Sequence, residues 1–139
     1  MKKLTQAEID SLLDKAQEAR DHSYAPYSKY NVGAALMTAD GQIYQGCNIE
    51  NAGFTPTVCA ERTAFFKAVY DGHRAFRAIA VIATGEELGC PCGVCRQVMA
   101  EFCDRDFIIV TANRDRTKVD VSDFETLLPH SFGPKDLGV

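Results

Sequence analysis

The sequence lacks the long apolar run of a membrane-spanning helix and the apolar stretch of a secretion signal. Although 46% of the residues are hydrophobic, no segment approaches the roughly eighteen consecutive apolar residues of a membrane span. The N-terminus turns polar at once, at the place where a signal peptide would carry its apolar stretch. We therefore expect a cytoplasmic protein that does not contact a membrane.

The sequence also lacks a run of basic residues. Its 15 lysines and arginines are outnumbered by 19 aspartates and glutamates, which gives a formal net charge of −4. A protein that binds nucleic acid usually displays a basic patch that neutralises phosphates. We therefore expect no nucleic-acid partner, and a small-molecule substrate is favoured.

Internal repeats, low-complexity segments and linkers are absent too. A chain of 139 residues fits one domain, expected over residues 1–139, and should bury roughly two-thirds of the surface of its unfolded state. Such a chain does not need a metal ion or disulfides merely to fold. A bound metal ion is therefore better explained by function than by stability.

The first half of the chain predicts a helix followed by a β-hairpin. A capping box at residues 5–8 starts an amphipathic helix that runs to about Arg20. Residues 23–30 form a loop, since Pro26 blocks a helix there. Strands are expected at residues 32–38 and 42–49, joined by a turn at Asp40-Gly41.

In the second half, predicted helices and apolar strands alternate: helix 58–70, strand 78–84, helix 92–102 and strand 107–111. This alternation implies right-handed parallel crossovers. The next connection is too short for a crossover, so a strand at residues 119–121 should return antiparallel. A short helix at residues 123–128, capped by Ser122, would end the fold. The sequence thus predicts an α/β fold with a mixed five-stranded sheet.

Three of the six cysteines have the spacing of metal ligands. Cys59 stands two residues before Glu61, and Cys92 and Cys95 lie three apart at the start of the second predicted helix. Three thiolates could hold a zinc ion with one position open for water, which is a catalytic arrangement. Glu61 would then carry protons, if Cys59 lies at the very start of its helix so that both side chains converge. Arg62 is expected to hydrogen-bond to a thiolate and offset its charge.

A fourth thiol, that of Cys90, offers an alternative. If Cys90 joined the other three cysteines, the zinc ion would be closed to water, and the protein would be a zinc-stabilised binding or assembly module without catalysis. The rigid Pro91 between Cys90 and Cys92 disfavours this arrangement, which also leaves Glu61 without a role. Zinc stoichiometry after replacement of Cys90 by serine would separate the two interpretations.

These motifs resemble those of the short, homotetrameric, zinc-dependent cytidine deaminases, over nearly the whole chain. The matching stretches are residues 24–28, 32–35, 46–52, 59–64, 91–97, 127–129 and 131–134. A Cys-x-Glu segment followed by Pro-Cys-x-x-Cys is a signature of zinc deaminases that act on nucleobases. The resemblance implies a three-layer α/β/α sandwich, one zinc ion per subunit, and hydrolysis of cytidine and deoxycytidine to the corresponding uridines and ammonia, a reaction of pyrimidine salvage.

The resemblance also implies roles for single residues. Glu61 would move a proton from the water at the metal to ring N3 of the base, and would then protonate the leaving amine. Asn48 and Glu50, two apart on one predicted strand, would hold the ribose 3′-hydroxyl. Backbone groups at Ala60 would read the edge of the pyrimidine.

Two aromatic residues complete the predicted site. Tyr30, where many relatives carry phenylalanine, would stack on the base, and Phe132 would reach into the site of a neighbouring subunit. Each site of the implied homotetramer would then need more than one chain. The nearest rival substrate is a cytosine-bearing antibiotic nucleoside such as blasticidin, but residues 48–51 and 62–64 look more like the cytidine enzymes.

Overall fold

The computed structural model describes residues 3–139, so the first two residues of the polar N-terminus, Met1 and Lys2, lie outside it. Five strands form one sheet: β1 (Val32–Thr38), β2 (Ile43–Cys47), β3 (Phe76–Ala83), β4 (Ile108–Ala112) and β5 (Val119–Asp123). Their order is β2-β1-β3-β4-β5. The longer helices are α1 (Gln6–Arg20), α2 (Ala60–Tyr70) and α3 (Gly93–Phe102).

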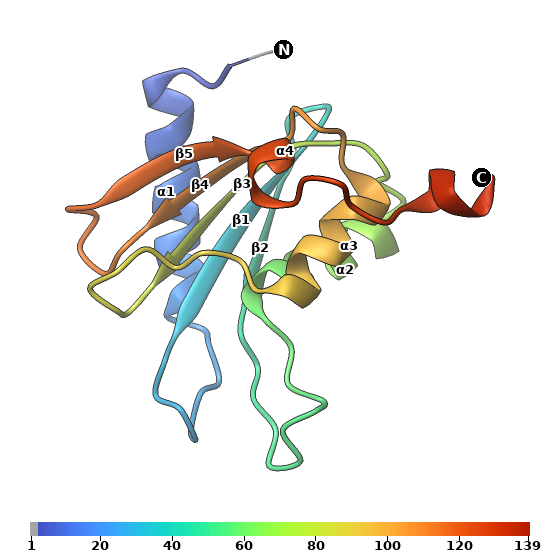
Figure 1. Cartoon of the computed structure of the whole chain (residues 1–139). Coiled ribbons are helices and arrows are strands. Elements are labelled where there is room, and N and C mark those ends of the chain that lie inside the picture. Colours follow the sequence, from blue (N-terminus) through green and yellow to red (C-terminus); the bar gives the residue numbers. More distant parts are fainter. Residues whose placement is uncertain (1–2) are drawn as a thin grey trace.

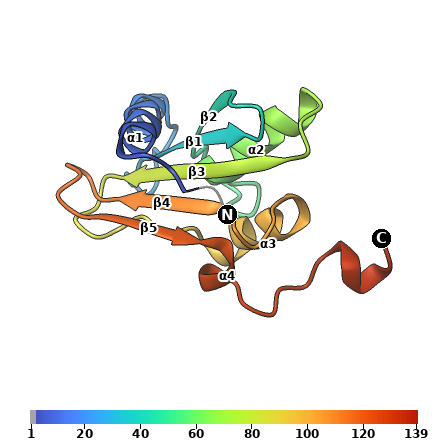
Figure 2. The same cartoon turned by 90° about the horizontal axis from the view of Figure 1, so that it is seen from above.

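The sheet lies between two helical layers. Figures 1 and 2 show α1 on one face and α2 with α3 on the other, so the predicted three-layer α/β/α arrangement is confirmed. The sheet is mixed, because β1 is antiparallel to both β2 and β3, whereas β3 and β4 are parallel. The predicted antiparallel return of β5 beside β4 is also confirmed.

Each face of the sheet has its own hydrophobic core. Leu12 and Leu13 of α1 pack over one face, and Phe65 of α2 and Met99 of α3 pack over the other. The central strand β3 is buried on both faces over its last six residues, which explains its continuously apolar sequence. The two cores fix the starts of α2 and α3 against the sheet.

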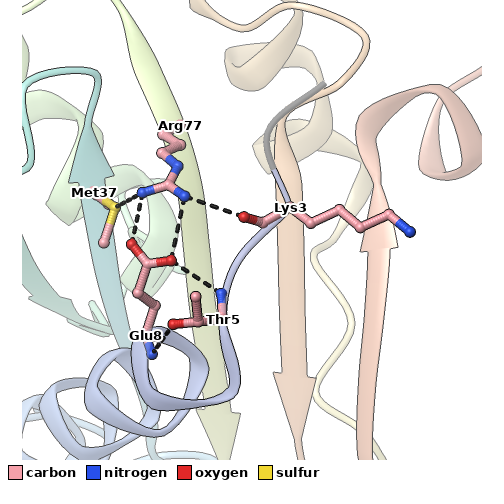
Figure 3. A network of polar contacts seen from close by, with 5 residues as sticks. All are labelled: Lys3, Thr5, Glu8, Met37 and Arg77. Carbon is pink, nitrogen blue, oxygen red and sulfur yellow. Dashed lines mark hydrogen bonds and ion pairs between the residues drawn. The ribbon is translucent and has the colours of Figure 1, made fainter.

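A polar cluster fastens the start of α1 to β3. Thr5 and Glu8 form the predicted capping box, and Glu8 also pairs with Arg77 of β3, with 2.7 Å between Oε2 and Nη1 (Figure 3). The Arg77 guanidinium donates further to the carbonyl of Lys3 and lies 3.7 Å from the sulfur of Met37. The hydrogen bond from Arg77 lowers the pKa of the Glu8 carboxyl.

Several predicted boundaries were wrong near the site. Strand β2 ends at Cys47 rather than residue 49, because Ile49 makes only single bridges, to Tyr24 and to Val58. Val58 is extended in that bridge, so α2 begins at Ala60 rather than residue 58. Strand β1 has its predicted bounds, and β3, β4 and β5 differ from their predicted ranges by one or two residues at one or both ends.

Two short helices end the chain. The first, α4 (Phe124–Leu127), is capped by Asp123, whose side chain accepts from the backbone N–H of Thr126. The prediction of Ser122 as the cap was wrong, because the helix begins at Phe124 rather than at residue 123, which makes Asp123 the N-cap. The second is a 3-10 helix, η1 (Pro134–Leu137), near the C-terminus.

Strand β2 and helix α2 touch through their backbones at Gly46. A Cβ atom on Gly46 would lie 2.3 Å from the carbonyl oxygen of Ala60 and 2.5 Å from the nitrogen of Ala64. Only glycine allows this approach, which fixes the first turn of α2. Among the residues that the structure describes, no helix is long and apolar enough to cross a membrane.

Candidate metal centre and active site

The three predicted metal ligands lie together at the starts of two helices. Cys59 is the N-cap of α2 and Cys92 is the N-cap of α3, both with extended backbone, and Cys95 lies in the first turn of α3. Their three sulfur atoms lie within 4.8 Å of one another. The Cys59 and Cys92 sulfurs are 3.6 Å apart, and those of Cys92 and Cys95 are 3.5 Å apart.

This cluster fits a zinc ion. Two sulfur atoms that each lie about 2.3 Å from a tetrahedral zinc ion are about 3.8 Å apart, close to the separations seen here. Thiolates are also ligands that zinc prefers. Among the described residues, Cys90 is not part of the cluster. The three sulfurs therefore fit one zinc ion per subunit with a fourth position left for water.

Positive charge surrounds the cysteines. Cys59 and Cys92 are the N-caps of α2 and α3, so both sulfurs lie at helix N-termini, where the helix dipole is positive. Nη2 of Arg62 lies 3.4 Å from the Cys59 sulfur, as predicted for this arginine. Hydrogen bonds from Cys95 and then from Arg62 lower the pKa of the Cys59 thiol to about 5. The cluster thus stabilises the thiolate that a metal ion requires.

Glu61 lies in the first turn of α2, two residues after Cys59. Its side chain is almost fully buried, with 4% of the residue exposed. Burial raises the pKa of this carboxyl to about 7, because the charged form loses its hydration. A carboxyl that holds and releases a proton near neutrality is well suited to general acid–base chemistry.

A cavity of about 270 Å³ opens beside the cysteines and Glu61. It is lined by most of the predicted site residues, together with others that the sequence did not indicate: Ser28, Tyr30, Val32, Asn48, Glu50, Thr57, Val58, Cys59, Ala60, Glu61, Val81, Gly89, Cys90 and Cys92. A larger hollow of about 580 Å³ lies between α2 and residues 49–58, but neither the thiols nor Glu61 line it. The smaller cavity is therefore the candidate active site.

Asn48 and Glu50 both line the cavity, although they follow β2 rather than lie on it. The Asn48 side chain accepts from the N–H of Val32 and donates to the carbonyl of Tyr30. The Glu50 carboxylate accepts from the backbone N–H of Tyr27, at 2.9 Å, and from the backbone and hydroxyl of Ser28. Both side chains thus hold the loop at residues 23–31, and each keeps unused hydrogen-bonding capacity for a ligand.

The two predicted aromatic residues lie in different places. Tyr30 lines the cavity, with its ring against Gly85. Phe132 is 58% exposed and does not line the cavity of its own chain. Of the residues that sequence analysis missed, Thr57 and Val58 directly precede Cys59, and Val81 belongs to the buried strand β3. The only sequence signal for Thr57 and Val58 is their position next to Cys59, and the only one for Val81 is its position near the end of an apolar strand.

The fold and the site together define a zinc-dependent hydrolytic deaminase, because an open three-thiolate metal site lies beside a buried carboxyl at one end of an α/β/α sandwich. A family model described as the cytidine and deoxycytidylate deaminase zinc-binding region matches residues 6–111. The chain belongs to this family.

Individual relatives are similar over almost their whole length. Cytidine deaminase of Sporosarcina psychrophila is 48% identical, over 94% of this chain and 95% of the relative. Cytidine deaminase of Halalkalibacterium halodurans is 46% identical, over 91% and 95%. The crystal structure of cytidine deaminase from Burkholderia pseudomallei, at 43% identity, superposes with a TM-score of 0.86 over 93% of this chain and 100% of that one.

Proposed function

We propose that this protein is a cytidine deaminase that acts on cytidine and deoxycytidine in pyrimidine salvage, in the cytoplasm. The observation that carries the proposal is the burial of Glu61 beside the three thiols in a cavity that can admit one nucleoside. The names of the relatives support a nucleoside substrate. In the proposed reaction, water adds at C4 of the cytosine ring and the amino group leaves as ammonia.

Glu61 has the properties of the proton carrier in this reaction. When held by the three cysteines, a zinc ion would lower the pKa of a water molecule at its open position. Glu61 would take one proton from the attacking water and place it on ring N3, and would then take the remaining proton from the hydroxyl at C4 and pass it to the amine, which leaves as ammonia. Its pKa near 7 supports this role, because the same carboxyl must both accept and release a proton within one turnover.

The cavity lining supports the proposed substrate contacts. Tyr30 offers an aromatic face to the base, and backbone groups at the buried Ala60 can read the edge of the pyrimidine. Asn48 and Glu50 supply polar atoms for the ribose 3′-hydroxyl. Since free cytosine has no ribose to bond with Asn48 and Glu50, we expect the nucleoside to be strongly preferred over the bare base.

A substrate panel tests the proposal directly. Purified, zinc-loaded protein is incubated with cytidine, deoxycytidine, cytosine and blasticidin, and turnover is followed by ultraviolet absorbance and ammonia release. Turnover of both nucleosides with little reaction of cytosine is the expected result. Turnover of blasticidin alone would instead establish a deaminase of an antibiotic nucleoside.

We also propose that the protein is a homotetramer in which Phe132 completes the site of a neighbouring subunit. The exposure of Phe132 outside its own cavity supports this role. Exposed aromatic residues elsewhere, with Phe54 at 74% and Tyr70 at 90%, offer surface that subunit contacts would bury. The C-terminal segment that carries Phe132 extends away from the sheet in Figure 1.

Mixed oligomers test this arrangement. In the Phe132→Ala variant each site keeps Glu61 but lacks the neighbour's phenylalanine, and in the Glu61→Gln variant the reverse holds. Co-assembly of the two chains should restore low-KM turnover at the Phe132→Ala subunits. If mixing gives no more activity than the sum of the two variants alone, or if the protein is a fully active monomer by light scattering, the cross-subunit role is wrong.

A further inference from the structure

Two adjacent side chains of α3 hold the C-terminal segment. Nε2 of Gln97 donates to the backbone carbonyl of Phe132 at 3.0 Å. Nη1 of Arg96 donates to the carbonyl of Leu127 at 2.6 Å, where the segment leaves α4. We call residues 128–139 the C-terminal tail. The bond from Arg96 fixes the start of the tail, and the bond from Gln97 fixes the backbone of Phe132.

The tail has few other attachments. Among the hydrogen bonds of the described residues, that of Gln97 is the only one that joins residues 129–139 to the rest of the chain. The side chains beyond it are largely exposed, with Leu137 at 73% and Val139 at 89%. The tail also lies near α3 at Gly133, where a Cβ atom would be 3.4 Å from the carbonyl oxygen of Ala100. Gln97 therefore supplies the polar contact that holds the backbone of Phe132, the residue whose ring is proposed to enter the neighbouring subunit's site. We call this hydrogen bond the tether.

Arg96 connects this tether to the metal site. Its Nε donates to the carbonyl of Pro91 at 2.8 Å, and Pro91 directly precedes the zinc ligand Cys92. One planar guanidinium therefore bonds both the loop that carries Cys92 and the chain that begins the tail. Because the guanidinium donors have a fixed geometry, they hold the two carbonyls at a fixed separation, which the single flexible ammonium of a lysine would not do.

We propose that Gln97 and Arg96 are positioning residues for the deamination reaction. Gln97 aims Phe132 at the neighbouring subunit's site, and Arg96 anchors the base of the tail to the zinc loop of its own subunit. Two adjacent residues of α3 thus position both Phe132, which contacts the neighbouring subunit, and the loop that carries the zinc ligand Cys92. This inference rests on the proposed cross-subunit role of Phe132.

The expected effect of losing the tether is on substrate binding. Among the hydrogen bonds of the described residues, the Gln97 side chain bonds to Phe132 and not to a zinc ligand or to Glu61, so the Gln97→Ala variant should keep the kcat of the wild type. One net hydrogen bond corresponds to a factor of about three to ten in an equilibrium. We therefore expect KM for cytidine to rise by about threefold to tenfold.

A double-mutant cycle in the full-length, zinc-loaded protein tests the Gln97 role. KM and kcat are measured for Gln97→Ala, Phe132→Ala and the double variant, with zinc content and Tm as checks on folding. Glu101→Ala, at an exposed position on the same helix, is the matched control and should resemble the wild type. If Gln97 acts through Phe132, its substitution raises KM in the wild type but adds nothing in the Phe132→Ala background.

Three outcomes would overturn the Gln97 role in different ways. If Phe132→Ala raises KM but Gln97→Ala does not, the tether is unimportant while the proposed role of Phe132 stands. If Gln97→Ala raises KM equally in both backgrounds, Gln97 acts by another route. If Phe132→Ala has the KM of the wild type, the cross-subunit proposal itself fails, and the inference fails with it.

Zinc retention tests the Arg96 role without relying on activity. The Arg96→Lys variant keeps the charge but loses the two-pronged hydrogen bonding, so it should lose zinc to an excess of chelator several times faster than the wild type. Gln97→Ala, which leaves the Pro91 carbonyl bound, should lose zinc at the wild-type rate. Equal rates for all three proteins would show that Arg96 does not position the zinc loop.

Discussion

Replacing Gly46 by alanine should displace the first turn of α2, which carries Glu61, and so impair the active site. The added methyl group would lie 2.3 Å from the carbonyl oxygen of Ala60 and 2.5 Å from the nitrogen of Ala64. Both are backbone atoms of the turn that carries Glu61, so no side-chain rotation relieves the contact. To reach an ordinary contact of 3.4 Å, β2 and the start of α2 must separate by about 1 Å.

Two effects of different size follow from this separation. Overpacking of this kind costs about 1–3 kcal/mol of stability, which for a chain of this length lowers Tm by about 3–10 °C. A displacement of about 1 Å at a catalytic group can lower turnover by about 100-fold. We therefore expect the Gly46→Ala variant to remain largely folded at the assay temperature while its kcat falls by much more than the loss of folded protein would explain.

Thermal unfolding, zinc content and cytidine turnover of Gly46→Ala are compared with those of Gly93→Ala. Gly93 lies inside the metal motif, yet a Cβ atom there meets nothing within 4 Å, so this control should be close to wild type. Wild-type kcat and Tm in Gly46→Ala would refute the argument that the contact of β2 with α2 positions Glu61. Equal damage in both variants would show that the motif, rather than the contact, is sensitive to an added methyl group.

Two further predictions concern the metal and the fold. Cys90→Ser should retain one zinc ion per chain by metal analysis, because Cys90 lies outside the sulfur cluster; loss of zinc would favour a closed, structural site. Arg77→Met should lower Tm at neutral pH by removing the partner of Glu8. Since the pKa of Glu8 is lowered from 4.5 in the folded state, its pairing stabilises the fold above that pH and is lost on further acidification. The Tm difference between variant and wild type should therefore shrink as the pH falls below 4.5, and a constant difference would contradict this assignment.

The sequence predicted most of the fold because its signals were local. The capping box at Thr5 and Glu8, the turn at residues 40–41 and the apolar run of β3 each depend on neighbouring residues, and each is present. The boundaries near the site were harder to predict, since the extended conformation of Val58 depends on its bridge to Ile49. That pairing is tertiary and leaves no periodicity in the sequence.

The candidate site shows the same division. The spacing of the cysteines and of Glu61 predicted the cluster, because chelation restricts which residues near a helix start can converge. Spacing could not show that the side chains of Asn48 and Glu50 also hold the loop at residues 23–31, nor that Val81 of a distant strand lines the cavity. Those facts follow from the packing of the hairpin and loop against β3 and α2.

The most direct test of the proposed function compares Glu61→Gln with the wild type in cytidine turnover, at equal zinc content. The substitution preserves the size of the side chain but removes its ability to carry a proton. The account predicts that the wild type converts cytidine to uridine and that Glu61→Gln, with one zinc ion per chain, is slower by about 100-fold to 10,000-fold. Comparable turnover in the two proteins, or no turnover by the zinc-loaded wild type, would contradict it.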